Sequence, residues 1–171
     1  LVQGDELLVQ VSREAVKTKQ PSVTTKISMN GKYLVFTIGN GKLGCSGKLS
    51  GAEKTRLRQW GQEQKLPEDL GMIIRTNASG VAEEDLNTEF VRLMEQYTYL
   101  KGPATHRTAC SCVLRARPAY LSSVLGSRSN FLKEILTDDK KIYEELSAFL
   151  QEEMPEDCNK LRFYEDRSYP L

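Results

Sequence analysis

Long hydrophobic runs are absent from this sequence of 171 residues. No apolar stretch approaches the roughly 18–20 residues that a membrane-spanning helix needs, and no basic segment leads into an apolar one as in a secretory signal peptide. Nucleotide-binding loops of the usual kinds are missing too, since neither G-x-x-x-x-G-K-[ST] nor G-x-G-x-x-G occurs. We therefore expect a cytoplasmic protein without membrane contact that holds no nucleotide in such a loop.

Histidine is limited to His106, and cysteine occurs four times. A single histidine and the absence of a G-x-S-x-G motif leave little basis for Ser–His or Cys–His catalysis. Cys110 and Cys112 near His106 suggest a zinc site, but no second closely spaced pair of ligands accompanies them. Four scattered cysteines are also too few for a disulfide framework. Reduced structural cysteines in a reducing cytoplasm are the favoured interpretation, and no metal site is predicted.

Charge of neither sign dominates, because the formal net charge is +1. Hydrophobic residues make up 39% and charged residues 27% of the chain, as in a folded globular protein. The charges are unevenly distributed: residues 1–65 contain 11 Lys/Arg against 5 Asp/Glu, whereas residues 66–171 contain 13 against 18. The basic first part could attract a polyanion, although ordinary solvated charge explains the same asymmetry.

Strand patterns dominate the beginning of the chain. Residues 6–12 predict a short strand. β-Branched and aromatic residues on both sides of Asn30-Gly31 predict a hairpin with a two-residue type I′ turn, in which both residues have positive φ. Apolar residues at 72–74 predict a buried strand over residues 71–76.

Helix signals follow the hairpin. Ser50 and Glu53 form a capping box, so a helix is predicted from there to about residue 64, with Leu57 and Trp60 facing inward. Acidic residues after Gly80 suit the first turn of a second helix, because the helix dipole favours anions there. Apolar residues then recur at helical spacing up to Gly102-Pro103, namely Leu86, Phe90, Leu93, Met94, Tyr97 and Leu100.

The last third of the sequence alternates between strand and helix patterns. Strands are predicted at residues 111–116, 131–136 and 161–165, and helices at 119–125 and after Thr137-Asp138. Such alternation is typical of α/β organisation. Together with the hairpin region, it predicts an α+β fold for the whole chain.

Paired carboxylates occur in four places, but none predicts a catalytic centre. A two-metal nuclease needs carboxylates that converge on ions roughly 3.5–4 Å apart. The pairs fall at predicted helix starts or on helix faces, where solvated charge is normal. Asp138 follows a predicted strand, and helix capping explains it adequately. No catalytic residue is predicted, and a metal-dependent hydrolase that uses Asp138 remains an alternative.

The stretch GMIIRTNASG at residues 71–80 places Arg75 and Thr76 directly after three apolar residues. An arginine that ends a buried strand is costly unless something pairs with it. A guanidinium is a planar fork of donors that matches two phosphate oxygens, and a threonine hydroxyl and a turn glycine N–H add neutral donors. If this strand lies beside the 30–35 turn, Gly31, Arg75 and Thr76 converge on one anion. The alternative is a salt bridge between Arg75 and a helix carboxylate.

Several segments together resemble the ribonuclease E/G family of endoribonucleases. VTTKISMNGKYLVF (residues 23–36) is similar to the segment that joins the family's RNA-binding barrel to its 5′ sensor. LPEDLGMIIRTNASG (66–80) resembles the strand and turn of that sensor, whose hallmark is a consecutive Arg-Thr. EILTDDKKIYEEL (134–146) and LRFYEDRSYPL (161–171) resemble the ribonuclease H-like region that follows. The matches keep the family's order over nearly the whole chain.

The family's sensor binds the 5′-monophosphate of an RNA substrate. The resemblance implies that Arg75 and Thr76 are the Arg-Thr pair of this sensor. It also implies that Gly31 is the hairpin glycine and that Val35 is the hydrophobic position beside the terminal nucleotide.

Basic positions of the family are matched less completely. Arg13 and Lys19 correspond to basic positions at the end of the RNA-binding barrel, which makes them weaker candidates for RNA contact. Ribonuclease E members carry an arginine-rich stretch after the glycine loop. Here that stretch reads Cys45-Ser46-Gly47-Lys48, so one basic contact is lost.

The resemblance further implies three parts: a remnant of an OB-type barrel at 1–20, a mixed-sheet 5′ sensor at 21–102, and an incomplete α/β ribonuclease H-like segment at 103–171. The family's metal-binding carboxylates would follow residue 171, so Mg²⁺ is expected only for that catalytic domain and this chain alone is expected to be inactive. The expected partner is single-stranded RNA with a 5′-monophosphate, bound by a homo-oligomeric parent enzyme of RNA processing and decay. A protein-interaction or scaffold module without a phosphate site is the alternative function.

Overall fold

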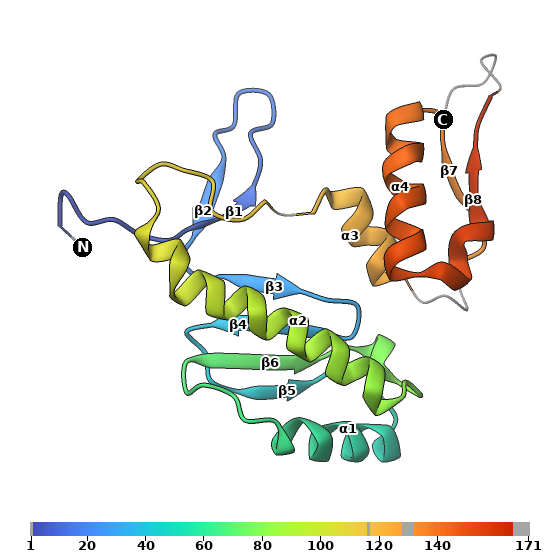
Figure 1. The fold of residues 1–171 in the computed structure, drawn as a ribbon, viewed down its shortest axis with the longest axis horizontal. Helices are drawn as coiled ribbons and strands as arrows, with labels where there is room; N and C mark the ends of the chain where they lie inside the picture. The colour runs from blue at the N-terminus through green and yellow to red at the C-terminus, as the bar shows by residue number, and fades with distance from the viewer. Residues whose placement is uncertain (1, 116, 128–131, 166–171) are drawn as a thin grey trace. The chain divides into compact units, whose positions relative to one another are not determined.

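The computed structural model describes residues 2–115, 117–127 and 132–165, which form two compact units (Figure 1). The first unit spans residues 1–115 and the second spans residues 116–171. Both units contain helices and strands, so the α+β organisation predicted from the sequence is confirmed. The assignment of residues 1–20, 21–102 and 103–171 to named domains stays a prediction.

A mixed four-stranded sheet forms the centre of the first unit, with strand order β3-β4-β6-β5 (Figure 1). Strand β4 pairs antiparallel with β3 and with β6, whereas β5 runs parallel to β6. The bounds are β3 Ser28–Asn30, β4 Leu34–Ile38, β5 Leu43–Cys45 and β6 Leu70–Ile74. The short β5 lies in a glycine-rich segment for which no strand is predicted from the sequence.

Helices α1 (Gly51–Glu63) and α2 (Glu83–Lys101) pack on one face of this sheet. The ring of Phe90 on α2 lies edge-on to Phe36 of β4, with centroids 5.5 Å apart, and to Trp60 of α1 at 6.3 Å. These three rings join both helices to the sheet. The fully buried aliphatic side chains around them are Leu34, Leu57, Leu70, Met72, Ile74, Leu86 and Leu93.

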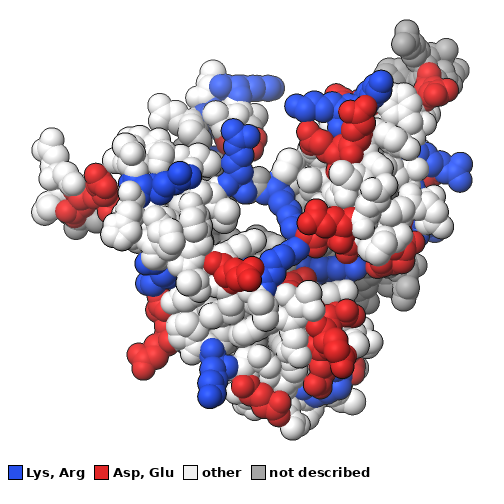
Figure 2. All heavy atoms as spheres, viewed as in Figure 1, with Lys and Arg blue, Asp and Glu red and all other residues white. Residues whose placement is uncertain are grey.

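The predicted start of α1 is confirmed, with one change in the role of Glu53. Ser50 Oγ accepts the backbone N–H of Glu53 at 3.4 Å, and Leu57 and Trp60 face the core as expected. Glu53 does not complete the capping box, because its carboxylate accepts the backbone N–H of Gly80 at 2.8 Å instead. The start of α2 is also confirmed: Figure 2 shows acidic side chains gathered there, where Glu83, Glu84 and Asp85 form the first turn.

The turn between β3 and β4 differs from the predicted type I′ geometry. Asn30 belongs to β3 and pairs with Val35, so the connection is longer than two residues. Neither Asn30 nor Gly31 has positive φ. The N–H groups of this turn bond to a side chain of α2, which removes the need for the left-handed backbone that an isolated Asn-Gly turn uses.

The start of the chain forms a separate two-stranded antiparallel sheet of β1 (Gln10–Arg13) and β2 (Ser22–Thr24). The predicted strand at residues 6–12 is therefore found only in its last part. Within residues 2–115, no barrel accompanies this sheet. Val11 and Val23 face each other across it and are 59% and 57% exposed, so this pair contributes nothing to the core.

The second unit is a strand–helix–strand arrangement. Strand β7 (Ile135–Thr137) pairs parallel with β8 (Leu161–Phe163), and helix α4 (Lys140–Glu153) connects them. Helix α3 (Ala119–Gly126) precedes them, as predicted. The buried residues of its hydrophobic cluster are Ile135, Leu146, Leu150 and Met154.

Several details of the last third differ from the prediction. The strands predicted at 131–136 and 161–165 are the shorter Ile135–Thr137 and Leu161–Phe163. Residues 111–115 form no strand, and residue 116 lies outside the described residues. The cap of α4 is Asp139 rather than Thr137-Asp138: its Oδ1 accepts the N–H groups of Lys141 and Ile142 at 2.8 and 3.0 Å. Asp138 is exposed one position earlier. Among the helices of the described ranges, none has the length and hydropathy needed to cross a bilayer.

Asp69 joins the start of β6 to the last turns of α2. Its carboxylate accepts the Tyr97 hydroxyl at 2.7 Å and forms an ion pair with Lys101 at 2.9 Å. Hydrogen bonds from Lys101 and then from Tyr97 hold the pKa of Asp69 below its ordinary value. The same carboxylate, with burial, raises the pKa of Tyr97 to about 12.

We expect the Asp69→Asn variant to lose part of the acid sensitivity of the fold. A lowered carboxylate pKa stabilises the fold above the ordinary Asp value of about 3.9, and this contribution disappears as the pH falls through the lowered pKa. The melting temperature of Asp69→Asn should fall near neutral pH and change less between about pH 5 and pH 2. Circular dichroism melts test this, with the exposed Glu68→Gln as control. An unchanged pH dependence would contradict the assignment.

Candidate anion-binding site

Arg75 stands at the end of β6, beside the turn that joins β3 and β4. Its Nη1 donates a hydrogen bond to the Gly31 carbonyl at 2.8 Å, and its backbone N–H donates to the Tyr33 carbonyl at 2.7 Å. The side chain is half-buried, and no carboxylate of the described residues forms an ion pair with it. The salt bridge considered from the sequence is therefore not found. The guanidinium keeps its full charge and further N–H groups for a ligand.

Thr76, the residue after Arg75, contacts the loop on the other side of β6, next to β5. Its Oγ1 lies 2.8 Å from Ser46 Oγ, in the loop that follows β5. The backbone N–H of Ser46 donates to the Ile74 carbonyl at 2.9 Å, and the N–H of Lys48 donates to Ser46 Oγ at 3.3 Å. The basic side chain of Lys48 thus belongs to a loop that is bonded to the Arg-Thr pair. The sequence alone indicates only the basic position lost at Gly47.

Gly31 meets Arg75 through its carbonyl rather than through its N–H. The Gly31 N–H donates to the Leu34 carbonyl at 2.8 Å inside the turn, so it differs from the exposed donor expected from the sequence. Gly31 and Arg75 therefore share a hydrogen bond and Thr76 follows Arg75 in the chain, whereas the convergence of the three residues on one anion stays a prediction.

Glu89 of α2 is the residue that sequence reasoning missed. Its Oε2 accepts the N–H of Lys32 at 2.9 Å, and its Oε1 accepts those of Tyr33 and Leu34 at 2.8 and 2.7 Å. The side chain is only 8% exposed. A signal existed in the sequence, since Glu89 falls on the buried face of the helix defined by Leu86, where a charge needs a partner.

The backbone after Thr76 is fixed by α1. Glu53 accepts the N–H of Gly80 at 2.8 Å and pairs with Arg56 at 3.1 Å, while Arg56 Nη2 donates to the Val81 carbonyl at 3.2 Å. The hydrogen bond from Arg56, followed by that from Gly80, holds the pKa of Glu53 below its ordinary value. The 3₁₀ turn Thr76–Ala78 is therefore followed by a segment with its own anchor.

Val35 lies next to Ile73 on the face of the sheet that carries neither helix. The two residues are direct cross-strand partners, and Ile73 is 45% exposed. Gly44 opposes Ile73 on β5 and leaves its flank uncovered. Side chains alternate along a strand, so Arg75 projects toward the same face as Ile73. The predicted hydrophobic position Val35 thus forms an apolar pair with Ile73 on this face.

The weaker candidates do not join this site. Arg13 in β1 and Lys19 after it are both exposed, and no described interaction links either residue to Arg75. His106 and the pair Cys110 and Cys112 are exposed as well. Among the described residues, no group of three His, Cys, Asp or Glu side chains could hold a metal ion.

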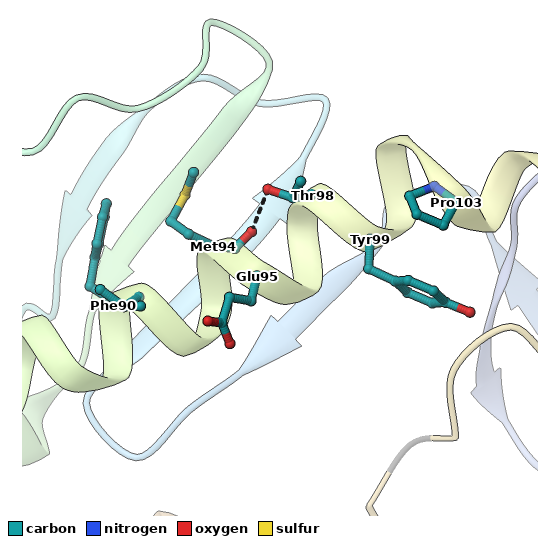
Figure 3. Close-up of a pocket in the computed structure, with 7 residues that line it drawn as sticks. Phe90, Met94, Glu95, Thr98, Tyr99 and Pro103 are labelled. Atoms are coloured by element: carbon teal, nitrogen blue, oxygen red, sulfur yellow. Dashed lines mark hydrogen bonds between the residues drawn. The ribbon is translucent and has the colours of Figure 1, made fainter.

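An apolar groove lies beside α2 (Figure 3). Thr98 Oγ1 donates to the Met94 carbonyl at 2.8 Å within the helix, so the groove offers few polar groups for a phosphate. Its lining residues are Phe90, Val91, Met94, Glu95, Thr98, Tyr99 and Pro103. The apolar lining of this groove differs in chemistry from the guanidinium and hydroxyl groups of Arg75 and Thr76.

Comparison with known proteins assigns the chain to a family. The model of the Ribonuclease E/G family matches residues 28–171. The chain belongs to the Ribonuclease E/G family. It is 34% identical to Ribonuclease G of Salmonella typhimurium over 95% of its own length and 33% of that relative. It is 27% identical to Ribonuclease E of Haemophilus influenzae, over 96% and 18% of the two lengths.

Another relative is the chloroplastic Ribonuclease E/G-like protein of Arabidopsis thaliana, with 26% identity over 98% of this chain and 18% of the relative. The chain therefore spans at most about a third of the length of these Ribonuclease E/G relatives. The family match includes Gly31, Val35, Arg75 and Thr76, whereas Arg13 and Lys19 precede the matched residues.

We expect the Gly31→Ala variant to be destabilised by about 1–3 kcal/mol, as overpacked sites are. A Cβ at Gly31 would lie 2.1 Å from Glu89 Oε1, and that oxygen cannot move without breaking its bonds to the turn. Gly47→Ala is the matched control, because a Cβ at Gly47 meets nothing within 4 Å. Urea denaturation compares the two variants. Equal stability would contradict the tight contact, and the penalty should shrink in a Glu89→Ala background.

Proposed function

We propose that the chain is the RNA-binding part of a ribonuclease E/G-like endoribonuclease and that it recognises single-stranded RNA by its 5′-monophosphate. The observation that carries this proposal is the arrangement of Arg75. Its guanidinium is held by a neutral carbonyl and lacks an acidic partner within the described residues. The next residue, Thr76, presents a hydroxyl that is bonded to Ser46. A cation that is oriented but not neutralised is suited to an anionic ligand.

The chemistry of a terminal phosphate supports this choice of ligand. A 5′-monophosphate carries up to two negative charges and three unbridged oxygens, more than an internal phosphodiester offers. Arg75 can supply a bidentate pair of donors, and the Thr76–Ser46 hydroxyl pair can supply a neutral one. The loop that contains Lys48 adds positive charge near the same end of the sheet. These donors favour the group with more charge and more accessible oxygens.

The open face of the sheet supports a role for the first nucleotide itself. Val35 and Ile73 lie beside each other on the side toward which Arg75 projects. A nucleobase could cover these apolar side chains while its 5′-phosphate lies on Arg75, which suits a single-stranded end whose base is unpaired. Placement of the 5′ end would then help to position a distant bond for cleavage.

We further propose that cleavage uses residues outside this chain, with Mg²⁺ as the metal of that catalytic part, and that the parent enzyme acts as a homo-oligomer in the cytoplasm in RNA processing and decay. In this chain the exposed Asp138 belongs to no described carboxylate cluster that could hold a metal ion. RNA cleavage by the isolated chain with Mg²⁺, lost on Asp138→Asn, would overturn this part of the proposal.

We expect Arg75→Ala to lower the affinity for 5′-monophosphorylated RNA by roughly 10–100-fold, which corresponds to one charge-assisted hydrogen bond of about 1.5–3 kcal/mol. Affinity for the same RNA with a 5′-hydroxyl should change little. Arg75→Lys should also weaken binding, because an ammonium cannot reproduce the bidentate fork. Fluorescence anisotropy with both RNAs measures the difference, and Arg107→Ala, which removes an exposed arginine elsewhere, is the charge-matched control.

Equal affinity of the unmodified chain for the two RNAs would contradict recognition of the 5′-phosphate. That result would favour the alternative function of a protein-interaction or scaffold module. The apolar groove along α2, with Val91 56% exposed, is the observation that speaks for this alternative.

The isosteric change Val35→Thr tests the apolar surface. Replacing a methyl by a hydroxyl removes about 0.8 kcal/mol of apolar burial, so affinity for 5′-monophosphorylated RNA should fall about fourfold. The same RNA with an abasic first nucleotide should bind unmodified chain and variant equally. A fourfold loss that persists with the abasic RNA would show that Val35 acts on something other than the terminal base.

A further inference from the structure

The carboxylate of Glu89 uses every N–H group of the 31–34 turn that the turn does not use itself. It accepts from Lys32, Tyr33 and Leu34 at 2.9, 2.8 and 2.7 Å, and Gly31 donates to the Leu34 carbonyl. No backbone donor of this turn remains for a phosphate. The turn therefore contributes to the anion-binding site only through the way it orients other groups.

Glu89 and Arg75 both contact the backbone of Gly31. A Cβ at Gly31 would lie 2.1 Å from Glu89 Oε1, so the carboxylate is in contact with the Gly31 backbone. The carbonyl of the same residue accepts from Arg75 Nη1 at 2.8 Å. Glu89 of α2 and Arg75 at the end of β6 thus both contact Gly31. The orientation of the guanidinium therefore depends on the direction of the Gly31 carbonyl.

We propose that Glu89 is a positioning residue for Arg75, and that it sets the preference of the site for a terminal phosphate over an internal one. This inference rests on the proposed function. Glu89 touches no ligand: it fixes the turn, the turn fixes the Gly31 carbonyl, and the carbonyl fixes one edge of the guanidinium. The remaining N–H groups of Arg75 then face one direction before RNA arrives.

Orientation matters because a flexible arginine binds any phosphate. A guanidinium that rotates freely adapts to a diester or a monoester. A guanidinium of fixed orientation binds more tightly to a group with two accessible oxygens in its plane. The negative charge of Glu89 also offsets part of the positive charge at the site, which weakens general attraction to the RNA backbone. Both effects increase discrimination between the two kinds of phosphate.

The Glu89→Gln variant separates positioning from fold stability. An amide keeps the size of the side chain but presents an NH₂ group to one of the turn N–H groups, so at least one hydrogen bond is lost. We expect the ratio of affinities for 5′-monophosphate and 5′-hydroxyl RNA to fall about tenfold, with the affinity for 5′-hydroxyl RNA unchanged or slightly higher. A purely structural defect would instead reduce both affinities by the same factor.

Asp69→Asn is the matched structural control. Asp69 is another carboxylate that joins α2 to the sheet, through Tyr97 and Lys101, but it lies at the opposite end of β6 from Arg75. This variant should lower the melting temperature and leave the ratio of affinities unchanged. If Glu89→Gln does not fold, Glu89→Asp shortens the reach to the turn by one methylene and is measured in the same way.

The outcomes distinguish the two levels of the proposal. If the unmodified chain prefers 5′-monophosphate RNA and a folded Glu89 variant keeps the full preference, the role of Glu89 is overturned while the proposed function stands. If the unmodified chain shows no preference, the proposed function fails and the role of Glu89 fails with it. Loss of the preference in Glu89→Gln, with retention in Asp69→Asn, supports both.

Discussion

The carboxylate of Glu89 is the constraint on which the candidate site depends. Two oxygens on helix α2 accept three consecutive backbone N–H groups of the β3–β4 turn, from residues that are 55 to 57 positions away in the sequence. This contact fixes the helix against the hairpin and requires a glycine at position 31, where a side chain would collide with the carboxylate. A buried carboxylate is stable there because each oxygen has backbone donors.

The order of strands in the central sheet brings the rest of the site together. Strand β6 lies between β4 and β5, so the residues at its end meet the turn before β4 on one side and the loop after β5 on the other. Arg75 takes its backbone and side-chain partners from the turn, and Thr76 takes its partner from Ser46 in the loop. The turn before β4, the residues after β6 and the loop after β5 are thus joined at one end of the sheet.

Membership of the Ribonuclease E/G family and the geometry of Arg75 support the same interpretation for different reasons. The family match covers the sequence around the Arg-Thr pair, whereas the structure shows which groups contact the guanidinium of Arg75. A buried arginine that serves only stability usually pairs with a carboxylate. Here the guanidinium bonds to a carbonyl, so its orientation is fixed while its charge remains available to an anion.

The elements whose signals are local could be predicted from the sequence. The capping residue Ser50 and the helical spacing of α2 predicted both helices of the first unit, and the apolar run before Arg75 predicted β6 with the Arg-Thr pair at its end. The turn geometry at Gly31 could not be predicted, because it depends on hydrogen bonds to the distant carboxylate of Glu89, and the backbone there lacks the positive φ of an isolated Asn-Gly turn. Hydrogen bonds between residues far apart in the chain depend on how a helix docks on a sheet, and no short pattern specifies that docking.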